Sequence, residues 1–208
     1  MIDFTGFPKI ARWNRDIIIT EKIDGTNAQI FIAKDCEPIE YKPGKVVPFL
    51  CGSRNRWVFP ESDNHGFAKW AYEHVYELLT LGPGSHFGEW WGQGIQRGYG
   101  LKEKRFSLFN VTRWKDGRPS CCSIVPVLYQ GPMFSEEPTV NRYFKYEEDT
   151  DYFQINHISE ALYKLRVDGS IAAPGFMKPE GVVIFHTASN HCYKVTLEND
   201  DKPKGVVV

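Results

Sequence analysis

The chain has 208 residues, with 25 Lys and Arg against 26 Asp and Glu and a formal net charge of −1. Hydrophobic residues make up 42% and aromatic residues 14%, so a core can form and a disordered chain is excluded. The length predicts one large domain or at most two small ones. No apolar run approaches the roughly 20 residues that cross a bilayer, and the start lacks a secretory signal. We expect a soluble protein with no membrane partner.

The cysteine and histidine patterns exclude further classes. The five cysteines are an odd number without a C-x-x-C spacing, and the six histidines form no H-x-x-x-H pair. These patterns argue against a disulfide framework, a structural zinc site and a zinc hydrolase. Free thiols fit a reducing compartment, and we therefore expect a cytoplasmic protein. The cysteines are Cys36, Cys51, Cys121, Cys122 and Cys192.

Basic residues are concentrated in one stretch, Gln93–Arg118, which has seven basic residues against two acidic ones. Such a stretch with interleaved aromatics suits contact with a polyanion, and a solvated loop of mixed charge fits equally well. Its glycines match neither G-x-G-x-x-G nor a P-loop. We interpret this part as a flexible loop in which Arg97 meets nucleic acid.

The first predicted elements are two strands around a tight turn. Asp16–Thr20 and Ala28–Ala33 are rich in β-branched and apolar residues, and Asp24 and Gly25 lie between them. This arrangement predicts a pair of strands with the turn at Asp24-Gly25.

A helix is predicted over Ser62–Leu81. Apolar residues recur there at intervals of three and four, Asp63 or Asn64 is a suitable N-cap, and Gly82 begins a Gly-Pro-Gly stop. Most of this apolar stripe is expected to be core.

The remaining elements complete a mixed fold. Many strands, two helices and no regular β-α alternation predict an antiparallel α+β domain instead of a doubly wound sheet. The later strands are expected over His86–Trp91, Phe106–Thr112, Ser123–Tyr129, Gly181–His186 and His191–Leu197, and the second helix over about His157–Val167.

The segment from Glu21 to Asn27 is the strongest candidate for chemistry. Lys22 leaves a strand just before the turn at Gly25, where a chain without a side chain can approach a ligand closely. A lysine amine in that place can act as a covalent nucleophile. Taken alone, an ordinary hairpin with an exposed lysine explains the segment equally well.

The rest of the chain favours the nucleophile. The string K-x-D-G-x-N resembles motif I of the covalent nucleotidyltransferases, the superfamily of ATP-dependent ligases and mRNA capping enzymes. Five further segments resemble the superfamily's motifs Ia, III, IIIa, IV and V in the expected order. They are Ser53–Asn55, Phe87–Gly92, Phe106–Val111, Glu180–Ile184 and Tyr193–Thr196.

Within that superfamily the chain is most similar to the RNA ligase 2-type branch. Asn27 stands where DNA ligases typically carry Arg, and the stretch from Gly88 to Phe109 follows the branch almost continuously. The resemblance implies an antiparallel β-rich, ATP-grasp-like nucleotidyltransferase domain with flanking helices. It also implies that the nucleotide binds in a cleft between sheets.

The resemblance assigns roles residue by residue. Lys22 would attack the α-phosphorus of ATP, and Glu89 would bind the ribose hydroxyls. Phe109 would stack on adenine. Glu180 would help to place Mg²⁺ or Mn²⁺, and Lys194 would stabilise charge on the α-phosphate.

Further nucleotide contacts are implied around motifs I and Ia. Glu21 would accept from the adenine amino group, with a structural role as the alternative, and Ile23 and Asn27 flank the nucleotide. Arg54 would lie near the nucleotide and the polynucleotide end, where a guanidinium suits phosphate.

The chain departs from the branch in two ways. Motif V typically reads K-x-K, whereas this chain has Lys194-Val195-Thr196, so another base such as Lys178 or Lys202 would have to supply the second charge. The chain ends at Val208. We therefore expect residues 1–208 to form a single nucleotidyltransferase domain without a C-terminal OB-type domain, whose role a partner protein would fill.

The sequence thus predicts an ATP-dependent RNA ligase. It would form a covalent lysyl-AMP, pass AMP to an RNA 5′-phosphate, and join that end to a 3′-hydroxyl, in separate strands or a nicked duplex. Three alternatives remain open: a DNA ligase, an mRNA guanylyltransferase with the same lysine chemistry, and a non-catalytic nucleic-acid-binding module.

Overall fold

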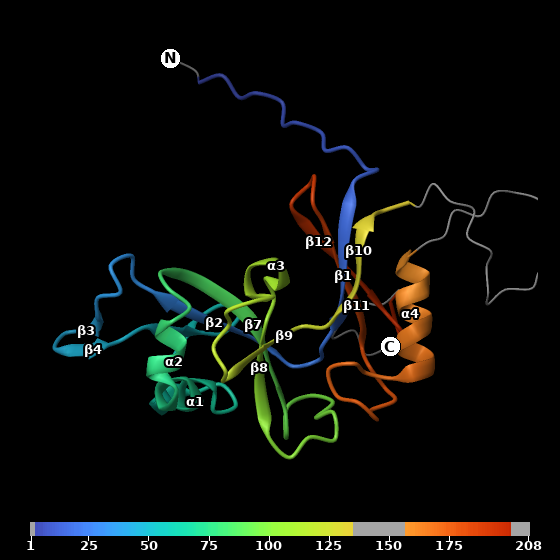
Figure 1. Ribbon diagram of the computed structural model, residues 1–208. Helices are drawn as coiled ribbons and strands as arrows, with labels where there is room; N and C mark the ends of the chain where they lie inside the picture. The colour runs from blue at the N-terminus through green and yellow to red at the C-terminus, as the bar shows by residue number, and fades with distance from the viewer. Residues whose placement is uncertain (1–2, 135–156, 201–208) are drawn as a thin grey trace, which may run out of the picture.

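The computed structural model describes residues 3–134 and 157–200, and it arranges most of the strands in two sheets (Figure 1). The first sheet has four antiparallel strands. From edge to edge they are β10 (Val127–Pro132), β1 (Asp16–Lys22), β11 (Gly181–His186) and β12 (His191–Thr196).

The second sheet has six strands, of which one pair is parallel. From edge to edge they are β6 (Trp57–Val58), β5 (Leu50–Gly52), β2 (Thr26–Ile32), β7 (Gly84–Gly92), β8 (Lys104–Leu108) and β9 (Cys122–Ile124). The parallel pair, β8 with β9, is an exception to the antiparallel pattern that the sequence predicts. A separate hairpin, β3 (Ile39–Lys42) and β4 (Lys45–Val47), extends from the end of this sheet (Figure 1).

The second sheet is an insertion in the first. After β1 the chain crosses at residues 23–25, forms all six strands of the second sheet, and returns at residues 125–126 to form β10. Both the nucleophile candidate and the turn after it therefore lie where the two sheets meet.

The predicted helix over 62–81 is interrupted. It consists of a short 3₁₀ turn (Pro60–Ser62), α1 (Phe67–Glu73) and α2 (Val75–Leu79). His74 separates the two helices, because its ring nitrogen bonds the Trp70 carbonyl and its backbone N–H donates to Ala71 instead. The N-cap of α1 is Gly66 and not Asp63 or Asn64 as predicted. The Asp63 carboxylate nevertheless accepts from the N–H groups of Ala68 and Lys69 in the first turn.

Two other predicted strands differ in their bounds from the strands in the structure. The strand over 106–112 ends at Leu108, and α3 (Val111–Trp114) follows, with the Asn110 side chain accepting from the Arg113 N–H at its start. The strand over 123–129 is divided between β9 and β10, which belong to different sheets. Pro126 lies at the division, where proline provides no N–H for a strand ladder.

Three apolar clusters hold these layers together. One fills the space between the second sheet and α1 and α2, and another lies between the first sheet and α4 (His157–Asp168). The third joins the two sheets through Ile18 and Ile23 on one side and Trp91 and Tyr99 on the other. Burial of this third cluster stabilises the relative placement of the sheets.

Two findings concern the cysteines and the helices. All five cysteines are free thiols. Within residues 3–134 and 157–200, none of the helices combines the length and the apolar character needed to cross a membrane.

Candidate functional site

Lys22 is the last residue of β1 and forms an ion pair with Glu180. Its Nζ lies 2.5 Å from Glu180 Oε2. Glu180 directly precedes β11, and Lys22 is opposite Gly181 in the ladder between the two strands. Pairing of β1 with β11 therefore brings together two charged groups that are 158 positions apart in sequence.

Glu89 contributes a second carboxylate from the other sheet. It lies in the interior of β7, and Oε1 accepts a hydrogen bond of 3.0 Å from the Gly25 N–H. Oε2 lies 3.4 Å from Asn27 Nδ2. Burial raises the pKa of Glu89 to about 7, although the positive charge of Lys22 opposes this rise.

The turn at residues 23–25 must approach β7 closely to make these contacts. A Cβ on Gly25 would lie 2.5 Å from the Trp90 carbonyl oxygen and 2.9 Å from the Glu89 side chain. Only glycine fits there without a shift of the backbone. The glycine of K-x-D-G therefore allows Glu89 to bind the turn directly.

Two residues from the loop after β7 also hold this turn. The Asp24 N–H donates to the Tyr99 hydroxyl at 2.8 Å, and Arg97 Nε lies 3.1 Å from Asp24 Oδ2. Arg97 also donates to the Lys178 carbonyl, so it links the turn to the segment before β11. The sequence analysis assigned Arg97 to nucleic acid and missed Tyr99, which has no motif around it beyond the flanking glycines.

Glu21 lies on the opposite face of β1 from Lys22, since successive side chains of a strand alternate. Its buried carboxylate accepts from the Ser170 hydroxyl and from the N–H groups of Ile171 and Ala172. Burial raises the pKa of Glu21, and these hydrogen bonds oppose the rise. This is the structural role that the sequence analysis gave as the alternative to adenine binding. Ile23 is buried between the sheets.

Phe109 and Lys194 lie on the faces that carry Glu89 and Lys22. Glu89 is opposite Ser107 in the ladder, so Phe109, two residues further on, points to the same face and is 40% exposed. Lys194 is opposite Val183, which is opposite Thr20, so Lys194 shares the face of Lys22.

Three further residues were singled out by the sequence. Arg54 is exposed in the turn after β5. Thr196, the departure in motif V, is opposite Gly181, and its hydroxyl donates to the Glu198 carbonyl at 2.9 Å. Lys202 lies outside the described residues.

A metal ion would need ligands besides protein carboxylates. Within the described chain, no group of three or more His, Cys, Asp and Glu side chains is arranged to hold one. Magnesium is commonly bound by one or two carboxylates together with substrate phosphates. Glu180, next to Lys22, is suited to that shared form of binding.

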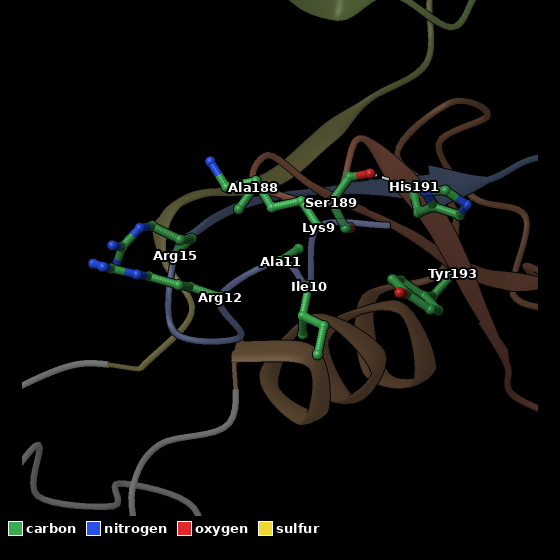
Figure 2. A pocket seen from close by; sticks show the side chains of 9 residues that line it. All are labelled: Lys9, Ile10, Ala11, Arg12, Arg15, Ala188, Ser189, His191 and Tyr193. Carbon is green, nitrogen blue, oxygen red and sulfur yellow. Dashed lines mark hydrogen bonds between the residues drawn. The ribbon is translucent and has the colours of Figure 1, made fainter. Parts of the chain in front are cut away.

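A cavity of about 660 Å³ lies elsewhere, between the N-terminal arm and β12 (Figure 2). Tyr193 lines it and alternates with Lys194 along β12, so the cavity is behind the face that carries Lys22. None of the predicted site residues is among its lining residues, which are Lys9, Ile10, Ala11, Arg12, Arg15, Ala188, Ser189, His191 and Tyr193.

Comparison with known proteins identifies the family. No curated protein sequence matches the chain. The fold is similar to a mutant of Naegleria gruberi RNA ligase solved with ATP and Mn, with a TM-score of 0.54 and 18% identity over 88% of this chain and 50% of that one. A second mutant of that ligase, solved with AMP and Mn, is similar with a TM-score of 0.53 and 17% identity, and the match covers 88% of this chain and 49% of that one. The chain thus spans about half the length of these structures. A family model for RNA ligase matches residues 15–196, so the chain belongs to the RNA ligase family.

Proposed function

We propose that the chain is the nucleotidyltransferase domain, ATP-grasp-like in fold, of an ATP-dependent RNA ligase of the RNA ligase 2 type. One observation carries this proposal. The 2.5 Å pair between Lys22 and Glu180 lies at the junction of the two sheets, where the positive charge of Lys22 also acts on the buried carboxyl of Glu89. Three segments that resemble motifs I, III and IV meet there.

In the first step Lys22 Nζ attacks the α-phosphorus of ATP. The Nζ–P bond forms, the bond to the bridging oxygen breaks, and pyrophosphate leaves with its electrons. Before this attack the Lys22 ammonium gives one proton to Glu180 Oε2, its ion-pair partner, and the second Nζ proton is released to solvent once the Nζ–P bond has formed. Glu180 would also help to hold a divalent ion, which would offset phosphate charge.

The other residues bind the nucleotide. The Glu89 carboxylate would accept hydrogen bonds from the ribose hydroxyls, and Phe109 would stack on adenine from the same face of the second sheet. Asn27 and Ile23 would position the nucleotide from the turn, and Lys194 would offset charge on the α-phosphate from the face of Lys22.

The later steps transfer AMP to RNA. The 5′-phosphate of one RNA end attacks the lysyl-AMP, which releases Lys22 and forms a pyrophosphate linkage between AMP and RNA. The 3′-hydroxyl of the other end then attacks the RNA 5′-phosphorus, and AMP leaves. Arg54, exposed in its turn, is suited to bind a phosphate of these ends.

The test is covalent labelling with α-labelled ATP or GTP. We expect acid-labile label from ATP on wild type, none on Lys22→Ala, and normal labelling of Lys45→Ala, an exposed lysine on β4. Label from GTP alone would identify a capping activity instead. No label on folded, unadenylylated protein would contradict the enzyme proposal and favour a binding module. Labelled protein is then offered RNA and DNA ends as acceptors.

A further inference from the structure

One row of residues crosses four strands of the second sheet in register and ends at Phe109, the residue after β8. Gly52 is opposite Trp57, Gln29 is opposite both Gly52 and Phe87, and Phe109 donates its N–H to the Phe87 carbonyl. Cross-strand neighbours point to the same face, so the row shares the face of Glu89. Four spacings between strands make it about 19 Å long.

Three large aromatic side chains of this row are open to solvent. Trp57 is 43% exposed, Phe87 54% and Phe109 40%. The other face of the same strands is buried under α1 and α2, so the row is not needed to complete that core. A patch of exposed aromatic surface on a sheet commonly indicates a binding surface.

The middle of the row is shaped to hold the Trp57 ring. A Cβ on Gly52 would lie 3.2 Å from that ring and 3.1 Å from the Gln29 side-chain oxygen. Glycine therefore lets the indole lie across β5, where it also contacts Phe31 with ring centroids 6.1 Å apart. Trp57 is thus held on the sheet while one of its surfaces stays exposed.

The basic residues beside this face, and its position next to the proposed nucleotide site, indicate what it binds. The turn before Trp57 carries Arg54 and Arg56, and Arg54 is exposed. In the ladder of β5 with β2, residues after Gly52 continue towards Asn27, so Arg54 lies at the end of the sheet that carries the nucleotide site. Exposed aromatics beside basic groups on a sheet stack nucleic-acid bases.

We propose that this row, from Phe109 to Trp57, binds the RNA strand next to the end being joined, with Phe87 and Trp57 each stacking on a base. The proposal rests on the proposed function, in which Phe109 stacks on adenine.

The test separates RNA binding from the chemistry. Binding of a fluorescent, 5′-phosphorylated single-stranded RNA is measured without ATP, for wild type, Trp57→Ala, Trp57→Phe and Tyr76→Ala. Tyr76 is a matched control, because it is 90% exposed and lies on α2, behind the sheet. We expect Trp57→Ala to weaken RNA binding by fivefold or more, on the order expected for one stacked base, and the other two variants to bind normally.

A second measurement does not depend on a variant's folding. RNA that contains 4-thiouridine is crosslinked to the wild-type protein by light, and the crosslinked peptide is identified. We expect it to contain Trp57 or Phe87. Unchanged affinity in folded Trp57→Ala, or crosslinks only outside the row, would overturn the proposal and leave the face to a protein partner.

Failure of the two proposals can be told apart. Label from ATP on Lys22 tests the proposed function and requires no RNA. We expect Trp57→Ala to accept that label at the wild-type rate, since the backbone of Trp57 is four strand spacings, about 19 Å, from that of Phe109. A loss of labelling in folded Trp57→Ala would contradict a role confined to RNA.

Discussion

Glu89 is a carboxyl group whose pKa burial raises into the physiological range. Its pKa rises from an ordinary value of 4.5 to about 7, because burial outweighs the attraction of Lys22 and the hydrogen bond from Gly25. A carboxylate that is to accept hydrogen bonds from both ribose hydroxyls must be ionised. The proposed nucleotide contact is therefore strengthened as pH rises through about 7.

The same shift predicts how stability changes with pH. Between pH 4.5 and 7 the folded protein binds the Glu89 proton more tightly than the unfolded chain, so the contribution of Glu89 to stability falls as pH rises. We expect wild type to lose up to about 3 kcal/mol relative to Glu89→Gln between pH 4 and pH 8. Urea unfolding of both proteins at a series of pH values measures the difference, and a constant difference would contradict the shift.

The sequence indicates which residue types form the candidate site but not all of their contacts. The ordered motifs single out Lys22, Glu89 and Glu180, and the structure brings Lys22 and Glu180 into contact. The partners of Glu21 could not be predicted, because Ser170 and the two amides beside it belong to a loop without a motif. Contacts of that kind depend on tertiary packing, which short patterns do not encode.

At the scale of elements, long strands with strong apolar patterns are predicted well and short ones are not. The predicted strands over 16–20 and 181–186 correspond to β1 and β11. β5 and β6 have three and two residues, too few for alternation to be visible. β5 pairs with β2, and β6 pairs with β5, so both depend on tertiary pairing. The break at His74 likewise depends on one ring nitrogen and its carbonyl partner.

Asp63 is expected to stabilise the first turn of α1. Asp63 accepts from Ala68 and Lys69 with its two oxygens, 2.8 and 2.9 Å from the donors. Replacing it with Ala removes both acceptors and is expected to cost about 1 kcal/mol, or roughly 2–4 °C in Tm. Asp63→Asn keeps one acceptor and is expected to lose about half as much. Equal Tm values for Asp63→Ala and wild type would show that these hydrogen bonds do not stabilise the helix.

At the scale of the molecule, the proposed nucleotide site is divided between the sheets. Lys22 and Lys194 belong to the first sheet. Glu89 belongs to the second sheet, and Phe109 directly follows its strand β8. A nucleotide bound to all four would hold the sheets together in addition to the cluster around Ile18 and Trp91. Binding energy would then appear as stability of the whole fold.

That division predicts stabilisation by ATP. In Lys22→Ala, which cannot form the adduct, ATP at about 100 times its Kd is expected to add about 2.7 kcal/mol, or roughly 5–10 °C in Tm. The same ATP concentration should stabilise Lys22→Ala with Glu89→Ala much less, because the ribose contact is lost. Thermal unfolding with GTP at the same concentration is the control, and equal shifts with both nucleotides would contradict adenine-specific binding.

The insertion of the second sheet into the first also determines the order in which the residues of the proposed site are synthesised. β1 leaves the ribosome before its neighbours in the sheet, which begin only at residues 127 and 181. At about 5–20 residues per second, on the order of ten seconds pass before β11 is synthesised. The second sheet is contiguous in sequence and can fold in that interval, while the Ile-rich strand before Lys22 remains unpaired. An incomplete nascent chain thus has Lys22, the proposed nucleophile, but lacks Glu180, and under the proposed function it would not consume ATP before translation has passed that residue.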